Sequence, residues 1–331
     1  MRVTQRVAKK AAALSILGAI LMASTFAQAQ EWPTKPIRMI VPFAPGGGTD
    51  FVSRLVAEHL GKRLGQTVYI ENRGGANGAI GMLALKQSDP DGYTIAASPD
   101  TPITANPSLQ PKLGYKPLED FIPVAPMVRF PSLIVANPSL KVKTLPELIA
   151  TAKAKPGSIA YSSSGIGGFS HLAMELFAAQ AGIKLLHVPY KGAGPASIGL
   201  IADEVQLGVN NVQVTLQNIQ AGQLVPIAVG ELERMSVLPD VPSIAETFPG
   251  FRITSWAGIF LPAKTPEAIV NRLQREITAI MKDPEVVRRL EAQQLFPYVL
   301  DQAAFSELLK TDTARWAGVI KSANIGLGDK R

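Results

Sequence analysis

Two glycine-rich loops, more than a hundred residues apart, carry groups that could bind an anion. The first runs from Pro42 to Asp50 (PFAPGGGTD) and the second from Tyr161 to His171 (YSSSGIGGFSH). Each follows a short apolar run and precedes a run with helical spacing of apolar residues. A turn of this kind presents bare backbone N–H groups at the positive end of a helix dipole. The pair of loops therefore predicts a cleft that holds a small anion from both sides.

Hydroxyl groups accompany the amides of the second loop, at Ser162, Ser163, Ser164 and Ser170. Hydroxyl and amide donors can bind a carboxylate without a buried cation. Ser170 suits a plain helix cap equally well. We expect Asp50, at the end of the first loop, to be a helix cap or a loop brace and not a general base, because the predicted ligand is itself anionic.

Phosphate binding and hydrolysis are the competing interpretations of these loops. Neither loop has the Lys-Ser/Thr ending of a P-loop or a G-x-G-x-x-G spacing. The stretch around Ser170 and His171 reads GFSHL, which lacks the second glycine of a G-x-S-x-G nucleophile elbow. The three histidines of the chain form no metal-binding spacing. We therefore expect no catalytic residues, no metal and no cofactor.

Polar residues at predicted strand ends are further candidates for the cleft. In an α/β sheet the carboxyl ends of the strands border the ligand crevice. Tyr190 and Lys191 end one strand, where a cleft role and a plain exposed strand end are equally good interpretations, and Asn210-Asn211 end the next. Phe43 and Trp256 are the aromatic residues that we expect nearest the ligand.

The pattern of strands and helices predicts two α/β lobes. A β-α-β-α-β run covers 37–97, and a second α/β unit covers 144–229. Extended segments at 128–136 and 252–261 look like two crossings between them, so the expected fold is two α/β lobes with parallel sheets, joined by a two-segment hinge that allows closure around a ligand. The expected boundaries are 1–29 for a leader, 30–131 with 253–331 for lobe 1, and 132–252 for lobe 2.

The N-terminus has the features of a secretory signal. A basic start, an uncharged apolar run at 11–25 and the sequence Ala27-Gln28-Ala29 predict cleavage near Ala29 and export to the periplasm. The chain has no cysteine, which excludes a lipid anchor at that site, disulfides and thiolate metal ligands. Beyond the leader, 29 basic residues face 26 acidic ones, and a net +3 is too weak to indicate nucleic-acid binding.

A set of ordered motifs links the chain to a known family. They are WPxKPIR at 32–38, PFxPGGxxD at 42–50, ENRxGA at 71–76, DGY at 91–93, SSxGxG at 162–167, HLA at 171–173, HVPYKG at 187–192, LPDVP at 238–242 and SWxG at 255–258. With this ordered set the chain resembles the substrate-binding receptors of tripartite tricarboxylate transporters, the Bug or TctC-like family, from about Trp32 to Ile325.

The resemblance implies a type II periplasmic-binding fold whose two lobes close on a small organic carboxylate, often with ordered water between. It also implies delivery of the ligand to a separate membrane permease, and we expect the receptor to be a monomer. Carried over by motif, one wall of the site would be Phe43, Pro45, Gly46, Gly47, Thr49 and Asp50. The other wall would be Ser162, Ser163, Gly165, Gly167, Ser170 and His171, to which the strand ends add Tyr190, Lys191 and Asn210.

One departure from the family bears on the ligand. Amino-acid-binding members are expected to offer a carboxylate near the strand end that Asn210-Asn211 occupy here. Two neutral amides would leave a ligand ammonium without a counter-charge. We therefore expect a di- or tricarboxylate or an aromatic carboxylate without an amino group. The alternatives are a receptor that signals to a sensor kinase and, less favoured by the residues, an exported serine hydrolase.

Overall fold

The structure is a computed structural model, and it describes residues 32–326. The expected leader at 1–29 lies outside the described residues. From Lys35 onward the chain is one compact unit, to which the description below refers.

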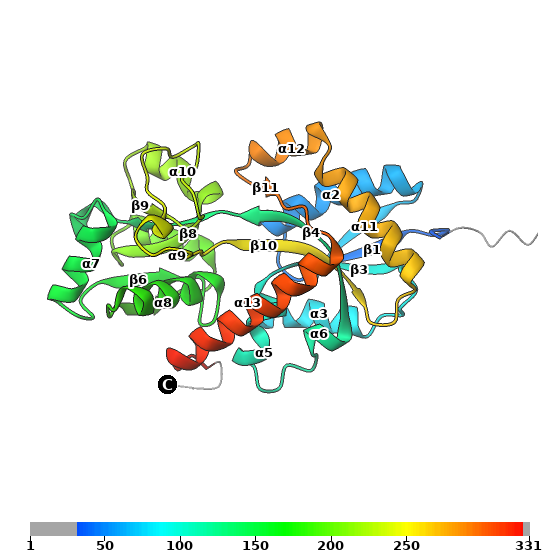
Figure 1. The fold of residues 1–331 in the computed structure, drawn as a ribbon, viewed down its shortest axis with the longest axis horizontal. Helices are drawn as coiled ribbons and strands as arrows, with labels where there is room; N and C mark the ends of the chain where they lie inside the picture. The colour runs from blue at the N-terminus through cyan, green and yellow to red at the C-terminus, as the bar shows by residue number, and fades with distance from the viewer. Residues whose placement is uncertain (1–31, 327–331) are drawn as a thin grey trace, which may run out of the picture. The chain divides into compact units, whose positions relative to one another are not determined.

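The strands form two separate sheets, one in each lobe (Figure 1). The strands of the first sheet are β1 (Ile37–Val41), β2 (Val68–Asn72), β3 (Thr94–Pro99), β4 (Phe121–Phe130), β10 (Ser255–Pro262) and β11 (Phe296–Pro297). Their order across the sheet is β11-β4-β10-β3-β1-β2. The strands of the second sheet are β5 (Ser132–Ala136), β6 (Ala160–Ser163), β7 (Leu186–Pro189), β8 (Leu207–Asn211) and β9 (Val225–Val229). Their order is β7-β6-β8-β5-β9.

Both sheets are mixed, although we expected parallel ones. The pairs β1–β2, β1–β3, β6–β7 and β6–β8 are parallel, as the β-α-β pattern predicts. The strands that carry the crossings, β4, β5 and β10, pair antiparallel with their neighbours. The reason is topological: β4 leads out of the first lobe and β10 leads back into it, so the two run in opposite directions side by side.

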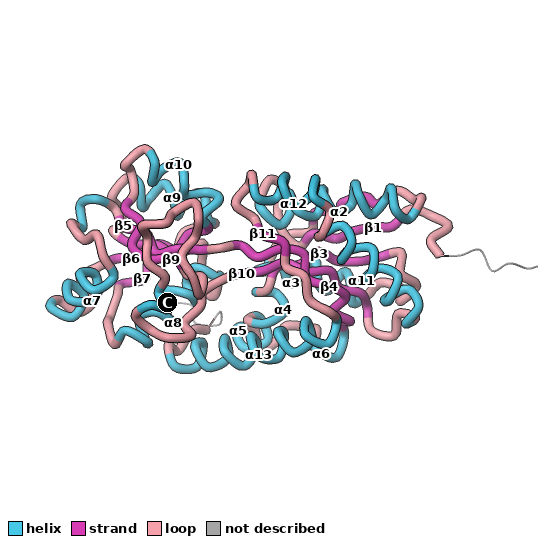
Figure 2. The backbone as a smooth tube through the Cα atoms, turned by 45° about the horizontal axis from the view of Figure 1, so that its top comes forward, coloured by secondary structure: helices cyan, strands magenta, loops and turns pink. Residues whose placement is uncertain are grey.

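Helices connect the strands and cover the sheets (Figures 1 and 2). In the first lobe they are α2 (Gly48–Leu64), η2 (Ala76–Gly78), α3 (Ala79–Lys86), α4 (Thr101–Thr104), α5 (Asn106–Leu109), α6 (Pro117–Asp120), α11 (Glu267–Met281) and α12 (Pro284–Glu291). In the second lobe they are η3 (Pro138–Leu140), α7 (Leu145–Ala154), α8 (Phe169–Ala181), α9 (Ala193–Ile201), α10 (Val212–Gln220) and η4 (Ile244–Glu246). The last helix is α13 (Gln302–Ser322).

The two helices that follow the glycine loops have well-defined ends. Each begins after a glycine in extended conformation, Gly47 for α2 and Gly168 for α8, with no side-chain cap. Each ends at a glycine in the left-handed conformation, Gly65 and Gly182, which a residue with a Cβ adopts at a cost. The loops thus lead directly into helices, as the sequence predicts.

The two crossings are hydrogen-bonded to each other where the chain passes between the sheets. The hydroxyl of Ser132 donates to the carbonyl of Ile253, and the N–H of Gly230 donates to the carbonyl of Ser132 at 2.7 Å. An ion pair of 2.8 Å joins Arg129, at the end of β4, to Glu231, which follows β9. These contacts tie together the segments about which the lobes would have to rotate.

Helix α13 contacts elements of both lobes. It packs on β4 and α4, and farther along on α5 and α8 (Figure 2). Its apolar side chains Trp316, Val319 and Ile320 share one buried cluster with Leu109 of α5 and Leu172 of α8. The C-terminal helix is therefore a third link between the lobes, which the pattern of crossings did not predict.

No helix within 32–326 is both long enough and apolar enough to cross a bilayer.

Candidate functional site

Both glycine loops contribute to one cavity between the two sheets. The cavity has a volume of about 180 Å³, equivalent to about six water molecules. The described residues that line it are Phe43, Gly48, Thr49, Asn77, Pro99, Asp100, Thr101, Phe130, Ser164, Gly168, Phe169, Asn211 and Ser255. Residues of β5–β9 and their helices thus face residues of the first lobe across a space suited to a small molecule.

Three helices begin at this cavity without a side-chain cap. They are α2 at Gly48, α8 after Gly168 and α10 after Asn211. The first turn of an uncapped helix has N–H groups without intrahelical acceptors, and the helix dipole adds partial positive charge there. One of these termini comes from the first lobe and two from the second, so donors approach the cavity from both sides.

The remainder of the lining is neutral or apolar, apart from one acid. None of the described lining residues is a lysine or an arginine. Phe43 and Phe130 of the first lobe and Phe169 of the second supply aromatic surface, and Thr49 and Ser164 supply hydroxyls. Such a site can bind an anion through dipoles and hydroxyls, and can enclose a short hydrocarbon chain between the rings.

Most of the predicted residues lie in the two glycine loops that contribute to this cavity, but few of them line it. Of the predicted set, Phe43 and Thr49 are lining residues. Ser164, one of the hydroxyl residues named from the sequence, and the unpredicted neighbours Gly48 and Gly168 line it too. In the first loop, Pro45, Gly46 and Gly47 are exposed and lie outside the lining.

Asp50 braces the first loop from inside. It is 5 % exposed, and its carboxylate accepts hydrogen bonds from the N–H of Gly46 (3.0 Å), from Asn72 (2.9 Å) and from two nitrogens of Arg54 (both 3.0 Å). Burial acts to raise the pKa of Asp50, but the hydrogen bonds from Arg54, Gly46 and Asn72 outweigh it and hold the pKa below its usual value. The side chain is fully engaged within its own lobe, as the loop-brace interpretation expects.

Replacing Asp50 with asparagine is expected to lower the free energy of unfolding by about 1.5–3 kcal/mol, because hydrogen bonds to a charged group are lost. Urea unfolding measures the change. Glu58→Gln is the matched control: Glu58 lies on the same helix and pairs with Lys62, but both side chains are exposed. This control should leave the unfolding midpoint unchanged, because exposed pairs contribute little. Equal destabilisation by the two variants would contradict the bracing role.

The second loop rests on two stacked imidazoles. The rings of His171 and His187 are 3.7 Å apart between centroids and nearly parallel, at 7°. The Nδ1 of His171 accepts a hydrogen bond from the N–H of Gly167 (3.0 Å), and the Nε2 of His187 lies 2.6 Å from the hydroxyl of Ser163. Burial lowers the pKa of His171 to about 3, with a further contribution from His187, and burial lowers the pKa of His187 to about 4. Both rings are therefore neutral at physiological pH and support the loop from behind.

The other predicted residues of the second loop also shape its backbone. The hydroxyl of Ser170 accepts from the N–H of Ser164 at 3.0 Å. Gly165 and Gly167 have φ values of 133° and 73°, which favour glycine. Ser162 is buried, and its hydroxyl has no hydrogen-bond partner among the described residues. Because Ser170 bonds to Ser164 and His171 to Gly167, the two side chains do not form the pair that a serine hydrolase requires.

Of the polar residues predicted at the strand ends, Tyr190, Lys191 and Asn210 are not among the described residues that line the cavity. The hydroxyl of Tyr190 donates to Glu204 at 2.8 Å, and the side chain of Lys191 is exposed. Asn210 contacts Ser197 at 3.5 Å, while its neighbour Asn211 lines the cavity.

Trp256 is not among the described residues that line this cavity. This side chain is 2 % exposed, its Nε1 donates to Asp312 at 2.8 Å, and its ring packs on Phe305 with 5.2 Å between centroids. The aromatic residues that accompany Phe43 in the cavity are instead Phe130 and Phe169.

Asp100 is the functional candidate that the sequence analysis missed. Among the described residues that line the cavity, it is the only one with a titratable side chain. A signal for it was present in the sequence, since Asp100 directly follows β3 and the carboxyl ends of strands border the crevice. Asn77 and Ser255 had no comparable signal, because only the folded chain brings η2 and the start of β10 to this point.

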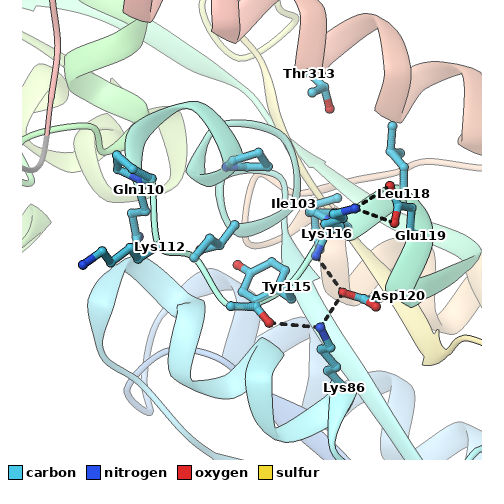
Figure 3. A pocket seen from close by; sticks show the side chains of 15 residues that line it. Lys86, Ile103, Gln110, Lys112, Tyr115, Lys116, Leu118, Glu119, Asp120 and Thr313 are labelled. Carbon is cyan, nitrogen blue, oxygen red and sulfur yellow. Dashed lines mark hydrogen bonds and ion pairs between the residues drawn. The ribbon is translucent and has the colours of Figure 1, made fainter.

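A larger cavity of about 740 Å³ lies on the first lobe, between α3, the α5–α6 segment and α13 (Figure 3). Two of its three described lysines are paired, because Lys86 contacts Asp120 at 3.0 Å and Lys116 contacts Glu119 at 3.0 Å, while Lys112 is exposed. It contains neither glycine loop and no residue of the second lobe. The smaller cavity, with its uncapped helix termini, is the better candidate for an anion.

Comparisons with known proteins agree with the fold. Residues 52–325 match the family model described as tripartite tricarboxylate transporter family receptor, TctC. Protein BugT of Bordetella pertussis is 35 % identical over 319 residues, which cover 95 % of this chain and 98 % of BugT.

Two solved structures of R. palustris proteins also resemble the chain. Rpa4515 with adipate is 32 % identical, with a TM-score of 0.81 over 90 % of this chain and 100 % of Rpa4515. MatC (Rpa3494) with bound malate is 29 % identical, with a TM-score of 0.76 over 87 % of this chain and 100 % of MatC. The fold is the two-lobed α/β fold of periplasmic binding proteins, and the chain belongs to the TctC, or Bug, family of tripartite tricarboxylate transporter receptors.

Proposed function

We propose that this protein is a periplasmic receptor, not an enzyme, that binds a small di- or tricarboxylate or an aromatic carboxylate between its lobes. The observation that carries the proposal is the cavity at which uncapped termini of α2, α8 and α10 meet. Open N–H groups and helix dipoles from both lobes stabilise a negative charge there without a lysine or arginine. The adipate and malate bound by similar receptors support the choice of ligand class.

The proposed receptor closes around its ligand and delivers it to the membrane permease of a tripartite transporter. We propose that the lobes meet at Pro131 and near Ile253, because β4 and β5 lie in different sheets on either side of Pro131 and β10 returns to the first sheet after Ile253. Helix α13 contacts both lobes, so closure would require a rearrangement where it packs on α8. The receptor would act as a monomer.

Isothermal titration tests the ligand class directly. Adipate, malate, citrate, terephthalate and nicotinate are compared with aspartate and glutamate on the protein without its leader. We expect at least one carboxylate that lacks an amino group to bind. In a separate unfolding measurement, that ligand at about 100 times its dissociation constant should add about 2.7 kcal/mol to the free energy of unfolding. Tight binding of aspartate or glutamate would refute the proposed ligand class, and failure of every carboxylate to bind would refute the proposed function.

A further inference from the structure

The buried carboxyl of Asp100 has one occupied oxygen and one free one. Its Oδ1 accepts hydrogen bonds from the hydroxyl of Ser255 (2.8 Å), from the N–H of Thr101 (2.8 Å) and from the hydroxyl of Thr101 (3.3 Å). Its Oδ2 is buried and has no partner among the described residues. The residue is 1 % exposed and lines the cavity between the lobes. A buried polar atom that lacks a protein partner and borders a cavity is a candidate to form a hydrogen bond with a ligand.

The charges around Asp100 leave it without a direct counter-ion. On α13, Asp312 and Arg315 form an ion pair of 3.1 Å with each other. The guanidinium of Arg315 also donates to the carbonyl of Arg252, on the second crossing, at 3.2 Å. Among the described residues, the second lobe contributes only neutral ones to the cavity, and β3, β10 and η2 contribute Pro99, Ser255 and Asn77, which do not titrate.

This environment favours the neutral acid. The pKa of Asp100 is raised to about 7: burial raises it most, the hydrogen bond from Ser255 opposes this, Asp312 raises it further, and Arg315 and the N–H of Thr101 lower it. A carboxylate ligand in the same cavity would act in the same direction as Asp312, because a second negative charge opposes ionisation. In the ionised form Asp100 would repel such a ligand, whereas in the protonated form it can donate a hydrogen bond to it. Enzymes use buried neutral carboxylic acids as donors to anions in this way.

We propose that Asp100 determines the specificity of the cavity as a neutral acid, whose O–H donates a hydrogen bond to a carboxylate of the ligand. Where Asp100 is ionised in the free receptor, binding takes up one proton from solvent. The same neutral form offers no counter-charge to an ammonium, so the cavity selects acids over amino acids. This inference rests on the proposed function and adds a pH dependence that the helix termini alone do not create.

Calorimetric titration of adipate and malate at pH 6.0 and pH 8.5 tests the inference, because both carboxyl groups of these ligands titrate below pH 6 and are mostly ionised at both pH values. The unaltered receptor should bind about 30-fold more weakly at pH 8.5 than at pH 6.0, because with a pKa of about 7 only about one Asp100 carboxyl in 30 is protonated at pH 8.5. Titrations in buffers of different ionisation enthalpy should count an uptake of about one proton at pH 8.5, a readout that depends on no variant.

Asp100→Asn keeps the shape and the acceptor for Thr101 but does not titrate. It should bind the same ligand with equal affinity at both pH values and without proton uptake. Asp240→Asn, which removes an exposed carboxylate of the second lobe, is the matched control and should keep the pH dependence.

The possible results separate the inference from the proposed function. Binding of a dicarboxylate with equal affinity at both pH values overturns the inference and leaves the receptor function standing. Binding that tightens as the pH rises and is lost in Asp100→Asn also overturns it, since this result would assign the ionised carboxylate to a ligand cation. If neither probe nor any other carboxylate binds at either pH, the proposed function fails and the inference fails with it.

Discussion

Gly48→Val is expected to weaken carboxylate binding at least tenfold, a loss of about 1.4 kcal/mol or more. Gly48 is the first residue of α2 and lies on the cavity. A Cβ at this position would lie 2.8 Å from the ring of Phe130 and 3.1 Å from the side-chain oxygen of Gln213, which belongs to the second lobe. The added side chain therefore occupies space beside the open N–H groups and obstructs the approach of the lobes. Titration with the ligand identified for the unaltered receptor measures the effect.

The neighbouring glycine is a matched control. A Cβ at Gly47 would meet nothing within 4 Å, and its backbone is extended (φ −83°, ψ 170°), a conformation that suits valine. Gly47→Val should bind with nearly unchanged affinity, and circular dichroism should show that both variants are folded. Unchanged affinity in Gly48→Val would mean that the ligand does not bind at the start of α2, and would remove the main support for the proposed site.

Acidification is expected to destabilise the receptor through the stacked pair His171 and His187. Both are neutral in the folded state because their pKa values are lowered from 6.5 to about 3 and about 4. The unfolded chain takes up protons as the pH falls below 6.5, while the folded chain does not. Their contribution is therefore complete above about pH 6.5 and is lost as the pH falls toward the folded values. Between pH 8 and pH 5 the loss is about 2 kcal/mol for each histidine, a large part of a typical total stability of about 5–15 kcal/mol.

The double variant His171→Asn with His187→Gln isolates this effect. The asparagine oxygen can still accept from the N–H of Gly167, and the glutamine amide can still bond to Ser163, but neither titrates. Urea unfolding at pH 8 and pH 5 measures how far the free energy of unfolding falls between the two pH values. We expect this fall to be about 4 kcal/mol smaller in the double variant than in the unaltered protein. His59→Gln, which changes the remaining histidine on α2, should keep the full dependence.

Asp100 acts in the opposite direction over the same range. Its pKa is raised from 3.8 to about 7, so the folded protein binds a proton below pH 7 that the unfolded chain does not bind until about pH 4. Its contribution to stability therefore grows on acidification and partly hides that of the histidines. Comparing the double variant with the unaltered protein at each pH cancels the Asp100 contribution. A double variant whose pH dependence equals that of the unaltered protein would contradict the role of the stack.

The local pattern of the sequence determined the elements and the family. Apolar periodicity and glycine turns indicated α2 and α8 and the loops that open them, because these signals depend on neighbours within a few residues. The ordered motifs indicated the receptor family, and the extended runs at 128–136 and 252–261 indicated the two crossings. The mixed pairing of the sheets did not follow from the local pattern, because strand direction depends on where the chain leaves and re-enters a sheet.

Only the tertiary structure decided which side chains meet at the cavity. The loops were identified, yet the lining residues are often one position away from the predicted ones, as with Gly48 and Gly168, because a turn directs successive residues to different sides. Asp100 comes to the site from the end of β3, and Ser255 from the returning strand β10, 155 residues farther along the chain. Whether a carboxyl is ionised depends on its burial and on charges brought from distant segments, and these exist only in the folded chain.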